Sequence, residues 1–238
     1  MTEILTTGRL LLRRWRDADR EPFQRLNADP RVMECMPGLL TAKQSNEMID
    51  RIEQHFERRG FGLFAAELLE NSVFLGFIGL AVPSFDASFM PAVEIGWRLS
   101  ADYWGRGLAT EGAQAVIQHA FGGLGLAGLV SFTVPENQRS RRVMEKLGMV
   151  RDPAEDFDHP RLPEGHPLRR HVLYRLNRER WNPGGIVSTQ RRPHATGSGS
   201  SALLDSLLLT LWRTGQQVLW RRQQQLRHRL PYRCEPTR

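Results

Sequence analysis

Hydrophobic positions follow a helical period in the first sixty residues. The apolar stripe of residues 41–60 begins at a Thr41/Gln44 pair typical of a capping box and ends at a glycine. Residues 17–27 form a shorter stretch with the same period. A short apolar run at residues 9–15 comes before both and is typical of an edge strand. This part of the chain therefore predicts one strand followed by two helices.

Beyond residue 60 the period changes to that of strands. Three β-rich runs separated by turn residues predict an antiparallel meander. A nearly all-apolar run, typical of a strand buried on both faces, then lies between two helical stretches. These segments are residues 61–69, 73–82 and 92–99 for the meander, 126–134 for the buried strand, 107–121 and 137–147 for the helices, and 149–151 and 171–176 for two last strands. The order predicts an α+β fold with a mixed, mostly antiparallel sheet of about six or seven strands, flanked by about four helices.

Charge divides the 238-residue chain into two parts. The formal net charge of +7 belongs wholly to residues 182–238, which hold nine arginines against one aspartate and one glutamate. Residues 1–181 carry no net charge and suit one domain in size, so their charge does not indicate a polyanion as partner. We therefore expect a domain of residues 1–181, a flexible glycine- and serine-rich linker of residues 182–201, and a basic tail of residues 202–238, helical or disordered.

The basic tail leaves several interpretations open. Its helical spacing of leucines suits a docking helix for a second copy of the chain, which would make a homodimer, or a helix on a membrane surface. Its arginines suit contacts with nucleic-acid phosphates. We favour an extension without a function of its own, because the preceding domain is complete, and we expect neither membrane nor nucleic acid as a partner.

Cysteine usage and the N-terminus bear on location. Cys35 and Cys234 are far apart and lack metal-ligand spacing, so a disulfide framework is not expected. Residues 1–12 lack the apolar core and small-residue cleavage site of a secretory signal. The most apolar tail segment, residues 202–212, is too short to span a bilayer. These observations predict a cytoplasmic, reducing location.

The candidate chemistry lies in residues 94–111, where a strand, a Gly-x-Gly turn and a helix start follow one another directly. Gly105 and Gly107 let the backbone bend tightly and allow a phosphate to approach the unsatisfied N–H groups of the first helical turn. Arg106 adds a positive charge, so the expected ligand is a pyrophosphate. A lone Gly-x-Gly is also common in turns that only join a strand to a helix, and the patterns of P-loop and dinucleotide folds are absent.

A second block, PENQRSRRVMEKLGM at residues 135–149, strengthens the functional interpretation. Together with EIGWRLSADYWGRGLATE at residues 94–111, it resembles the GCN5-related N-acetyltransferase (GNAT) superfamily, and within it the Rim-type branch that acetylates the N-termini of ribosomal proteins. The start TGRLLLR at residues 7–13 is similar too. The resemblance covers nearly all of residues 1–181 and none of the tail. It implies a GNAT-like sheet and an enzyme that moves acetyl from acetyl-CoA, its co-substrate, to a primary amine.

The resemblance also implies where acetyl-CoA binds. In this family the strand before the glycine turn splays from its neighbour at a bulge, and the pantetheine arm fills the gap as a pseudo-strand. The main chain at the end of the strand binds this arm, and the glycine turn with the first helical turn holds the pyrophosphate. The implied cofactor-binding residues are Trp97, Arg98, Leu99, Trp104, Gly105, Arg106, Gly107, Leu108, Ala109, Thr110 and Asn137. Asn137 suits the N-cap of its helix equally well.

Two catalytic residues are carried over from the family in the same way. Glu94 matches an acidic residue that acts as the general base for the attacking amine. Ser140 matches the proton donor of the Rim-like branch, since position 144, a tyrosine in many superfamily members, is Met144 here. A serine hydroxyl is a weak acid, so its help must come from positioning. The structural alternatives are a solvent-facing strand glutamate and a helix-surface serine.

Several predictions about ligands and partners stay open. No metal site is expected, because the histidines of the loop at residues 157–171 lack metal spacing, although His159 or His166 could contact the acceptor. The arginines near residue 140 could lie beside the adenosine phosphate. The acceptor amine is either a protein N-terminus or a small molecule. The alternatives to an enzyme are an acyl-CoA-binding module without catalysis and a nucleic-acid-binding protein acting through the basic tail.

Overall fold

The computed structural model describes residues 4–181, and the predicted linker and basic tail, residues 182–238, lie outside them. The helices are α1 (Arg20–Asn27), α2 (Pro30–Met33), α3 (Ala42–Arg59), α4 (Leu108–Gln118) and α5 (Gln138–Lys146). The strands are β1 (Leu5–Thr6), β2 (Leu10–Arg13), β3 (Leu63–Leu68), β4 (Val73–Ala81), β5 (Glu94–Leu99), β6 (Gly128–Thr133), β7 (Val150–Arg151), β8 (Phe157–Asp158) and β9 (Arg170–Asn177). None of the helices in this part of the chain is long and apolar enough to cross a bilayer.

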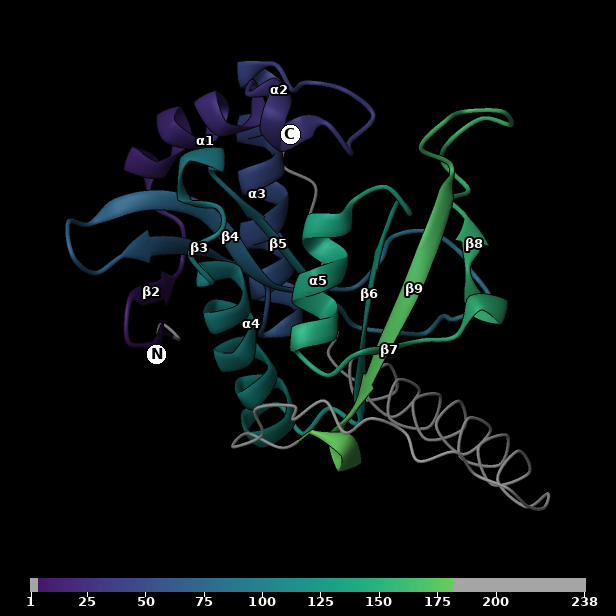
Figure 1. The fold of residues 1–238 in the computed structure, drawn as a ribbon. Coiled ribbons are helices and arrows are strands. Elements are labelled where there is room, and N and C mark those ends of the chain that lie inside the picture. Colours follow the sequence, from purple (N-terminus) through teal and green to yellow (C-terminus); the bar gives the residue numbers. More distant parts are fainter. Residues whose placement is uncertain (1–3, 182–238) are drawn as a thin grey trace, which may run out of the picture. The chain divides into compact units, whose positions relative to one another are not determined.

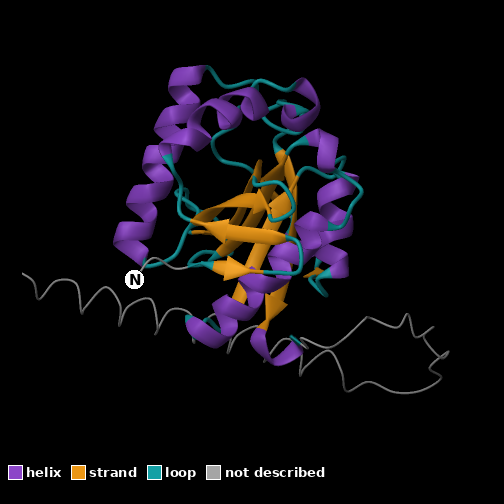
Figure 2. Cartoon of the chain, turned by 90° about the vertical axis from the view of Figure 1, so that its left-hand side faces the viewer, coloured by secondary structure: helices purple, strands orange, loops and turns teal. Residues whose placement is uncertain are grey.

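The strands form one sheet in the order β1-β2-β3-β4-β5-β6-β9-β7, and β8 also pairs with β9. Neighbouring strands run antiparallel except β5 and β6, which are parallel. Figure 1 shows α4 and α5 in front of the sheet and α3 behind it, and the turned view of Figure 2 shows helices on both sides of the strands. The predicted α+β class is confirmed, and residues 4–181 contain nine strands in place of about six or seven and five helices in place of about four.

Helix α3, the longest one within residues 4–181, follows the sequence prediction at both ends. Thr41 and Gln44 form the capping box: Thr41 Oγ1 accepts a hydrogen bond from Gln44 N, and Gln44 Oε1 accepts one from Thr41 N at 2.9 Å. Gly60 ends the helix in the left-handed region, at a φ of 77°. The predicted apolar stripe is buried through Ile49, Ile52 and Phe56.

Short elements account for the differences from the prediction. Strands β1 and β8, which the sequence does not predict, have two residues each, too few for a period of two to show in the sequence. Strand β7 is equally short but lies within residues 149–151, as predicted. Helix α2 begins at Pro30, in the segment between the two helices that the sequence predicts. Asp29 caps this single turn, because its side chain accepts a hydrogen bond from Arg31 N at 2.9 Å. A one-turn helix of this kind leaves no periodic pattern.

The bulge expected in the strand before the glycine turn does not occur in its pairing with β4. Strands β4 and β5 pair in regular register from Gly76↔Leu99 to Ala81↔Glu94. A register shift lies one strand away instead, at Ala66/Glu67 of β3. The expected separation of strands therefore arises on the other side of β5, where it meets β6.

A buried ion-pair network lies at the start of α1. Arg13 of β2 is 5% exposed and donates hydrogen bonds to both carboxylate oxygens of Asp19, at 2.7 and 2.9 Å. Its Nε donates to Glu67 Oε2 of β3 at 2.8 Å. Asp19 also accepts a hydrogen bond from Arg16 N at 2.8 Å. The network therefore ties β2, β3 and the beginning of α1 together.

Candidate active site

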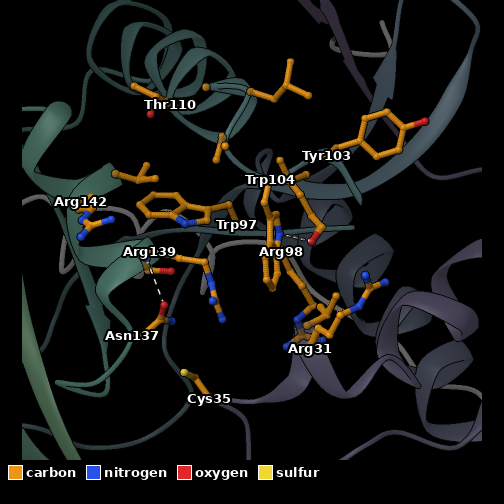
Figure 3. Close-up of a pocket in the computed structure, with 18 of the residues that line it drawn as sticks. Arg31, Cys35, Trp97, Arg98, Tyr103, Trp104, Thr110, Asn137, Arg139 and Arg142 are labelled. Carbon is orange, nitrogen blue, oxygen red and sulfur yellow. Dashed lines mark hydrogen bonds between the residues drawn. The ribbon is translucent and has the colours of Figure 1, made fainter. Parts of the chain in front are cut away.

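A cavity of about 310 Å³ opens where β5 leads into α4. Its walls are the end of β5, the glycine turn with the first turn of α4, one side of α5, and the segment from α2 to Met36. In Figure 3, Asn137, Arg139 and Arg142 lie on one side of the pocket and Arg98 and Arg31 on the other. Three stretches that are far apart in the sequence, residues 31–36, 97–110 and 137–146, therefore meet at one site.

The hydrogen-bond ladder fixes which way the main chain of β5 faces. Ser100 N donates to Leu75 O at 2.8 Å, just beyond the end of β5. Because an antiparallel ladder alternates, the main-chain groups of Arg98 face β4, while those of Trp97 and Leu99 face the opposite side. Main-chain groups are therefore available to a ligand at Trp97 and Leu99, whereas the main chain of Arg98 belongs to the sheet.

Strands β5 and β6 separate beyond their first pair. Val130 N donates to Val93 O at 2.9 Å, and Glu94↔Val130 is the register pair that joins the two strands. Beyond it, the outward main chain of β5 faces a gap instead of a strand. Near the end of the gap, Leu99 O accepts a hydrogen bond from Trp104 Nε1 at 2.8 Å. An extended ligand with amide groups of its own can occupy such a gap as an additional strand.

The glycine turn presents an uncapped helix N-terminus to the cavity. Gly105 and Gly107 have φ of 75° and 79°, the left-handed region that glycine enters without strain. Gly107 is the N-cap of α4 and has no side chain to satisfy the first N–H groups of the helix. Those groups and the positive end of the helix dipole favour an anion. The geometry fits the pyrophosphate expected from the sequence.

The N-terminal hairpin holds this turn in place. Arg9 Nη1 donates to the carbonyl of Arg106 at 2.9 Å. Glu111 of α4 accepts hydrogen bonds from Arg9 Nε at 2.7 Å, Arg9 N at 2.9 Å and Thr7 Oγ1 at 2.6 Å. Burial acts to raise the pKa of Glu111, but these hydrogen bonds outweigh it and lower the pKa below its usual range. We call this ionised arrangement of Thr7, Arg9 and Glu111 the Arg9–Glu111 clamp.

Positive side chains surround the cavity. The Arg139 guanidinium lies over the Trp104 ring, 4.3 Å from its centroid, and that of Arg106 lies over the Tyr103 ring at 4.9 Å. Two further cations line the cavity from α5, Arg142 and Lys146. A ligand with several negative charges would therefore be attracted to this site.

The start of α5 brings two predicted residues to the cavity. Asn137 is the N-cap: its Oδ1 accepts a hydrogen bond from Ser140 N at 3.1 Å, and its Nδ2 donates to Thr133 Oγ1 at 3.0 Å. Asn137 and Ser140 both line the cavity. The Ser140 hydroxyl makes no hydrogen bond to another residue in the described range, so it is available to a ligand.

Glu94 lies at the far end of β5 and does not line the cavity itself. Its Oε1 lies beside Gly96, where a Cβ would stand 3.8 Å away, so the carboxyl group leans along the strand toward the cavity. Burial raises the pKa of Glu94 to about 8. A carboxyl group with a pKa near the working pH is suited to proton transfer.

The family described as acetyltransferase (GNAT) domain matches residues 9–150, which is more than half of the chain. The chain belongs to the GNAT acetyltransferase family. The protein is therefore an N-acetyltransferase of the acetyl-CoA-dependent class, because GNAT proteins use acetyl-CoA and act on amine acceptors. Family membership does not give the acceptor.

Several known proteins are similar to this GNAT domain. The uncharacterized N-acetyltransferase YnaD of Bacillus subtilis (strain 168) is 27% identical over 179 residues, which are 75% of this chain and 99% of the relative. A GNAT-family acetyltransferase structure from Bacillus anthracis is 26% identical, with a TM-score of 0.62 over 74% of this chain and 99% of that chain. Mycobacterium smegmatis RimJ, solved with CoA-disulfide, is 21% identical, has a TM-score of 0.59 over 75% and 87% of the two chains, and shows the likeness in fold alone.

The GNAT domain brings most of the sequence-predicted site residues together. Every expected cofactor-binding residue except Arg106 lines the cavity, and so does Ser140. Arg106 is exposed, and its contribution to the cavity is through the turn that it shares with the two glycines. The gap along β5, the uncapped start of α4 and the surrounding cations together fit a coenzyme with an amide-containing arm and phosphates.

One wall of the cavity was missed from the sequence. It is the segment at and after α2, which contributes Arg31, Val32, Glu34, Cys35 and Met36. The segment has neither a periodic pattern nor a motif, and it lies more than sixty residues before the glycine turn. Only the folded chain places it beside β5, so no signal in the sequence could have assigned it.

The histidine-containing loop packs against aromatic side chains. His159 lies 4.5 Å from Phe85 and 5.1 Å from His171 between ring centroids, and burial lowers the pKa of both histidines. His166 Nδ1 accepts a hydrogen bond from Leu168 N at 3.1 Å. The contact of His159 or His166 with the acceptor stays a prediction. Within residues 4–181, no group of three or more potential ligands is placed to hold a metal ion.

The Arg9–Glu111 clamp gives a prediction for coenzyme binding. Glu111→Gln should weaken the binding of coenzyme A about 3- to 10-fold, because the glycine turn loses one tether and must be ordered by the ligand. Calorimetric titration with coenzyme A would measure this effect, with Glu164→Gln in an exposed loop as the matched control. An unchanged dissociation constant for Glu111→Gln would show that the clamp does not support the turn.

Proposed function

We propose that this protein transfers acetyl directly from acetyl-CoA to a primary amine, with both substrates bound at once. The observation that carries the proposal is that the gap beside β5 and the uncapped N-terminus of α4 belong to the same cavity. One end of this path can bind an extended arm through main-chain groups, and the other end can bind phosphates. The acceptor is a protein N-terminus or a small-molecule amine.

Each part of the path has a defined role in binding. The main chain of Trp97 and Leu99 would hold the pantetheine arm, and Asn137 would touch it from α5. Gly105, Gly107 and the first turn of α4 would hold the pyrophosphate. Arg142 and Lys146 would face the remaining phosphate. The supporting observations are the ladder alternation in β5 and the positive charge around the cavity.

The residues that would carry the chemistry are Glu94 of β5 and Ser140 of α5. Glu94 would take a proton from the amine, through a bridging water, while the amine nitrogen forms its bond to the acetyl carbon. The N–H of Trp97 faces the gap and would stabilise negative charge that develops on the acetyl oxygen. As the carbon–sulfur bond breaks, Ser140 would donate its hydroxyl proton to the leaving sulfur and recover one from solvent.

Thiol release from acetyl-CoA tests the proposal on the full chain. We expect coenzyme A to bind in a calorimetric titration, and thiol to be released with at least one acceptor class. The panel contains peptides with the N-terminal sequences of ribosomal proteins, free amino acids, and amines without a carboxylate. Turnover with the peptides alone would support the Rim-type branch.

Two outcomes would contradict the proposal in different ways. Coenzyme binding without turnover for any class of amine would leave an acyl-CoA-binding module. An absence of coenzyme binding would remove the site itself, and with it every role assigned along the gap.

A further inference from the structure

The side chain of Arg98 points away from the helices that form the proposed coenzyme site. Successive side chains of a strand alternate between the faces of the sheet, so Arg98 faces opposite to Trp97 and Leu99. On that face it lies across from Phe77 of β4, with its guanidinium 5.4 Å from the ring centroid. In Figure 3, Arg98 lies across the pocket from Arg139 and Arg142.

The guanidinium of Arg98 has few partners. Its Nη1 donates to Asn27 Oδ1 at 2.7 Å, and its Nη2 contacts the Met36 sulfur at 3.4 Å. Its Nε is buried and has no hydrogen-bond partner. A guanidinium has five N–H donors, and a thioether is a weak acceptor. The Nε–Nη2 edge, which is the edge suited to a planar two-oxygen group, is therefore unsatisfied.

No carboxylate within residues 4–181 forms an ion pair with Arg98. Glu34, the acidic residue in the cavity wall, is paired with Arg139 at 2.5 Å. The nearby Asp29 and Asp102 pair with Arg31, at 2.6 and 3.1 Å. A largely buried cation without a counter-ion is unfavourable, and burial lowers the pKa of Arg98 to about 10. The surroundings of Arg98 therefore favour a negatively charged ligand, because residues 4–181 supply no carboxylate to pair with its guanidinium.

We propose that Arg98 binds a carboxylate carried by the acceptor amine, through the Nε–Nη2 edge of its guanidinium. The proposal rests on the proposed acetyltransfer and names its substrate class. The coenzyme phosphates do not meet this need, because their donors lie at the glycine turn and α5, across the cavity. Met36, a flexible side chain, covers the edge and would move aside for the carboxylate.

The shared chemistry of the acceptor is an amine together with a carboxylate. Such a carboxylate comes either from a free amino acid or from the side chain of aspartate or glutamate at the start of a peptide. Two matched pairs of acceptors distinguish these sources. The first pair is alanine and alaninamide, and the second is an Asp-Ala-Ala amide and an Asn-Ala-Ala amide.

Thiol release with these pairs tests the proposal on the full chain. The wild-type protein should prefer the acid member of at least one pair by roughly 10- to 100-fold in kcat/KM, mainly through KM. Arg98→Gln should remove this preference, so that kcat/KM for the acid member falls to about that of its uncharged counterpart. Arg98→Lys should keep part of the preference, because it retains the charge but not the two-point geometry. Arg31→Gln, in the same wall but already paired, is the matched control.

Binding of product analogues separates this proposal from the proposed enzyme activity. N-acetylalanine and an N-acetyl-Asp-Ala-Ala amide carry the two kinds of carboxylate, and calorimetry measures their binding to the coenzyme A complex without turnover. At least one should bind more tightly than its uncharged counterpart, and Arg98→Gln should abolish the difference. Two results would overturn the assignment. One is equal affinity of the wild type for the acid and uncharged members of both pairs. The other is an equal loss of affinity for both members in Arg98→Gln while coenzyme A still binds.

Discussion

Glu94→Gln is expected to lower kcat by roughly 10²- to 10⁴-fold while leaving coenzyme A affinity nearly unchanged. Glutamine keeps the size and polarity of the side chain but cannot accept the proton that the amine must lose. Because Glu94 lies outside the cavity wall, its loss should not disturb the coenzyme contacts. Single-turnover thiol release would measure the chemical step, and calorimetry would measure the affinity. Glu70→Gln, an exposed carboxylate in the turn between β3 and β4, is the control.

The pH dependence of this reaction has a definite sign. Burial raises the pKa of Glu94 to about 8, so the fraction of carboxylate able to act as a base grows through the neutral range. The wild-type kcat should therefore rise with pH and level off above about 8, and the Glu94→Gln profile should lack this rise. Ser140→Ala should slow the reaction less and keep the rise. A Glu94→Gln variant with the full wild-type rate and profile would show that another group is the base.

The same pKa predicts a stability effect. A carboxyl group whose pKa is higher in the folded than in the unfolded chain holds its proton more tightly when folded. Its contribution therefore falls as the pH increases from about 4.5 to about 8. Glu94→Gln should lack this loss, and urea unfolding at several pH values would detect the difference.

Arg13→Met is expected to lower the free energy of unfolding by about 3–5 kcal/mol. The substitution leaves the carboxylates of Asp19 and Glu67 buried without their shared cation. For a domain of this size the melting temperature should fall by roughly 6–20 °C. Urea unfolding at neutral pH would measure the change in free energy.

Two further variants establish the cause of this loss. Arg16→Met, on a neighbouring side chain that is 60% exposed, should cost less than about 1 kcal/mol. Combining Arg13→Met with Asp19→Asn and Glu67→Gln should restore part of the stability, because no buried charge is then left unpaired. Equal losses for Arg13→Met and Arg16→Met would contradict the role of the network.

The sequence predicts the ends of an element where the residues that determine them lie within a few positions of one another. The capping box of Thr41 and Gln44 and the glycine at position 60 fixed both ends of α3, because capping depends on neighbouring backbone groups. Strands β1 and β8 and the single turn of α2 were not predictable in this way. Each is too short to leave a periodic pattern, although its partners lie close by in the sequence: β1 pairs with β2, and Asp29 caps α2.

The candidate active site also has parts that the sequence predicts and parts that it does not. The glycine turn and the start of α5 were recognisable, since each is a continuous block. The Arg9–Glu111 clamp joins residues about a hundred positions apart, and no spacing rule predicts it. The side of β5 to which Arg98 turns depends on the register with β4, which the sequence does not state. Because this register is not known from the sequence, the main chain of Arg98 was expected to bind the coenzyme. The structure instead pairs that main chain with β4.

The gap beside β5 also affects which substitutions the protein can accept during evolution. A ligand held through the N–H and C=O groups of Trp97 and the N–H group of Leu99 places no demand on the chemical identity of those side chains. Relatives could exchange them freely for other residues that pack, and still bind the same arm. Proline is the exception, because it removes the N–H on which the contact depends.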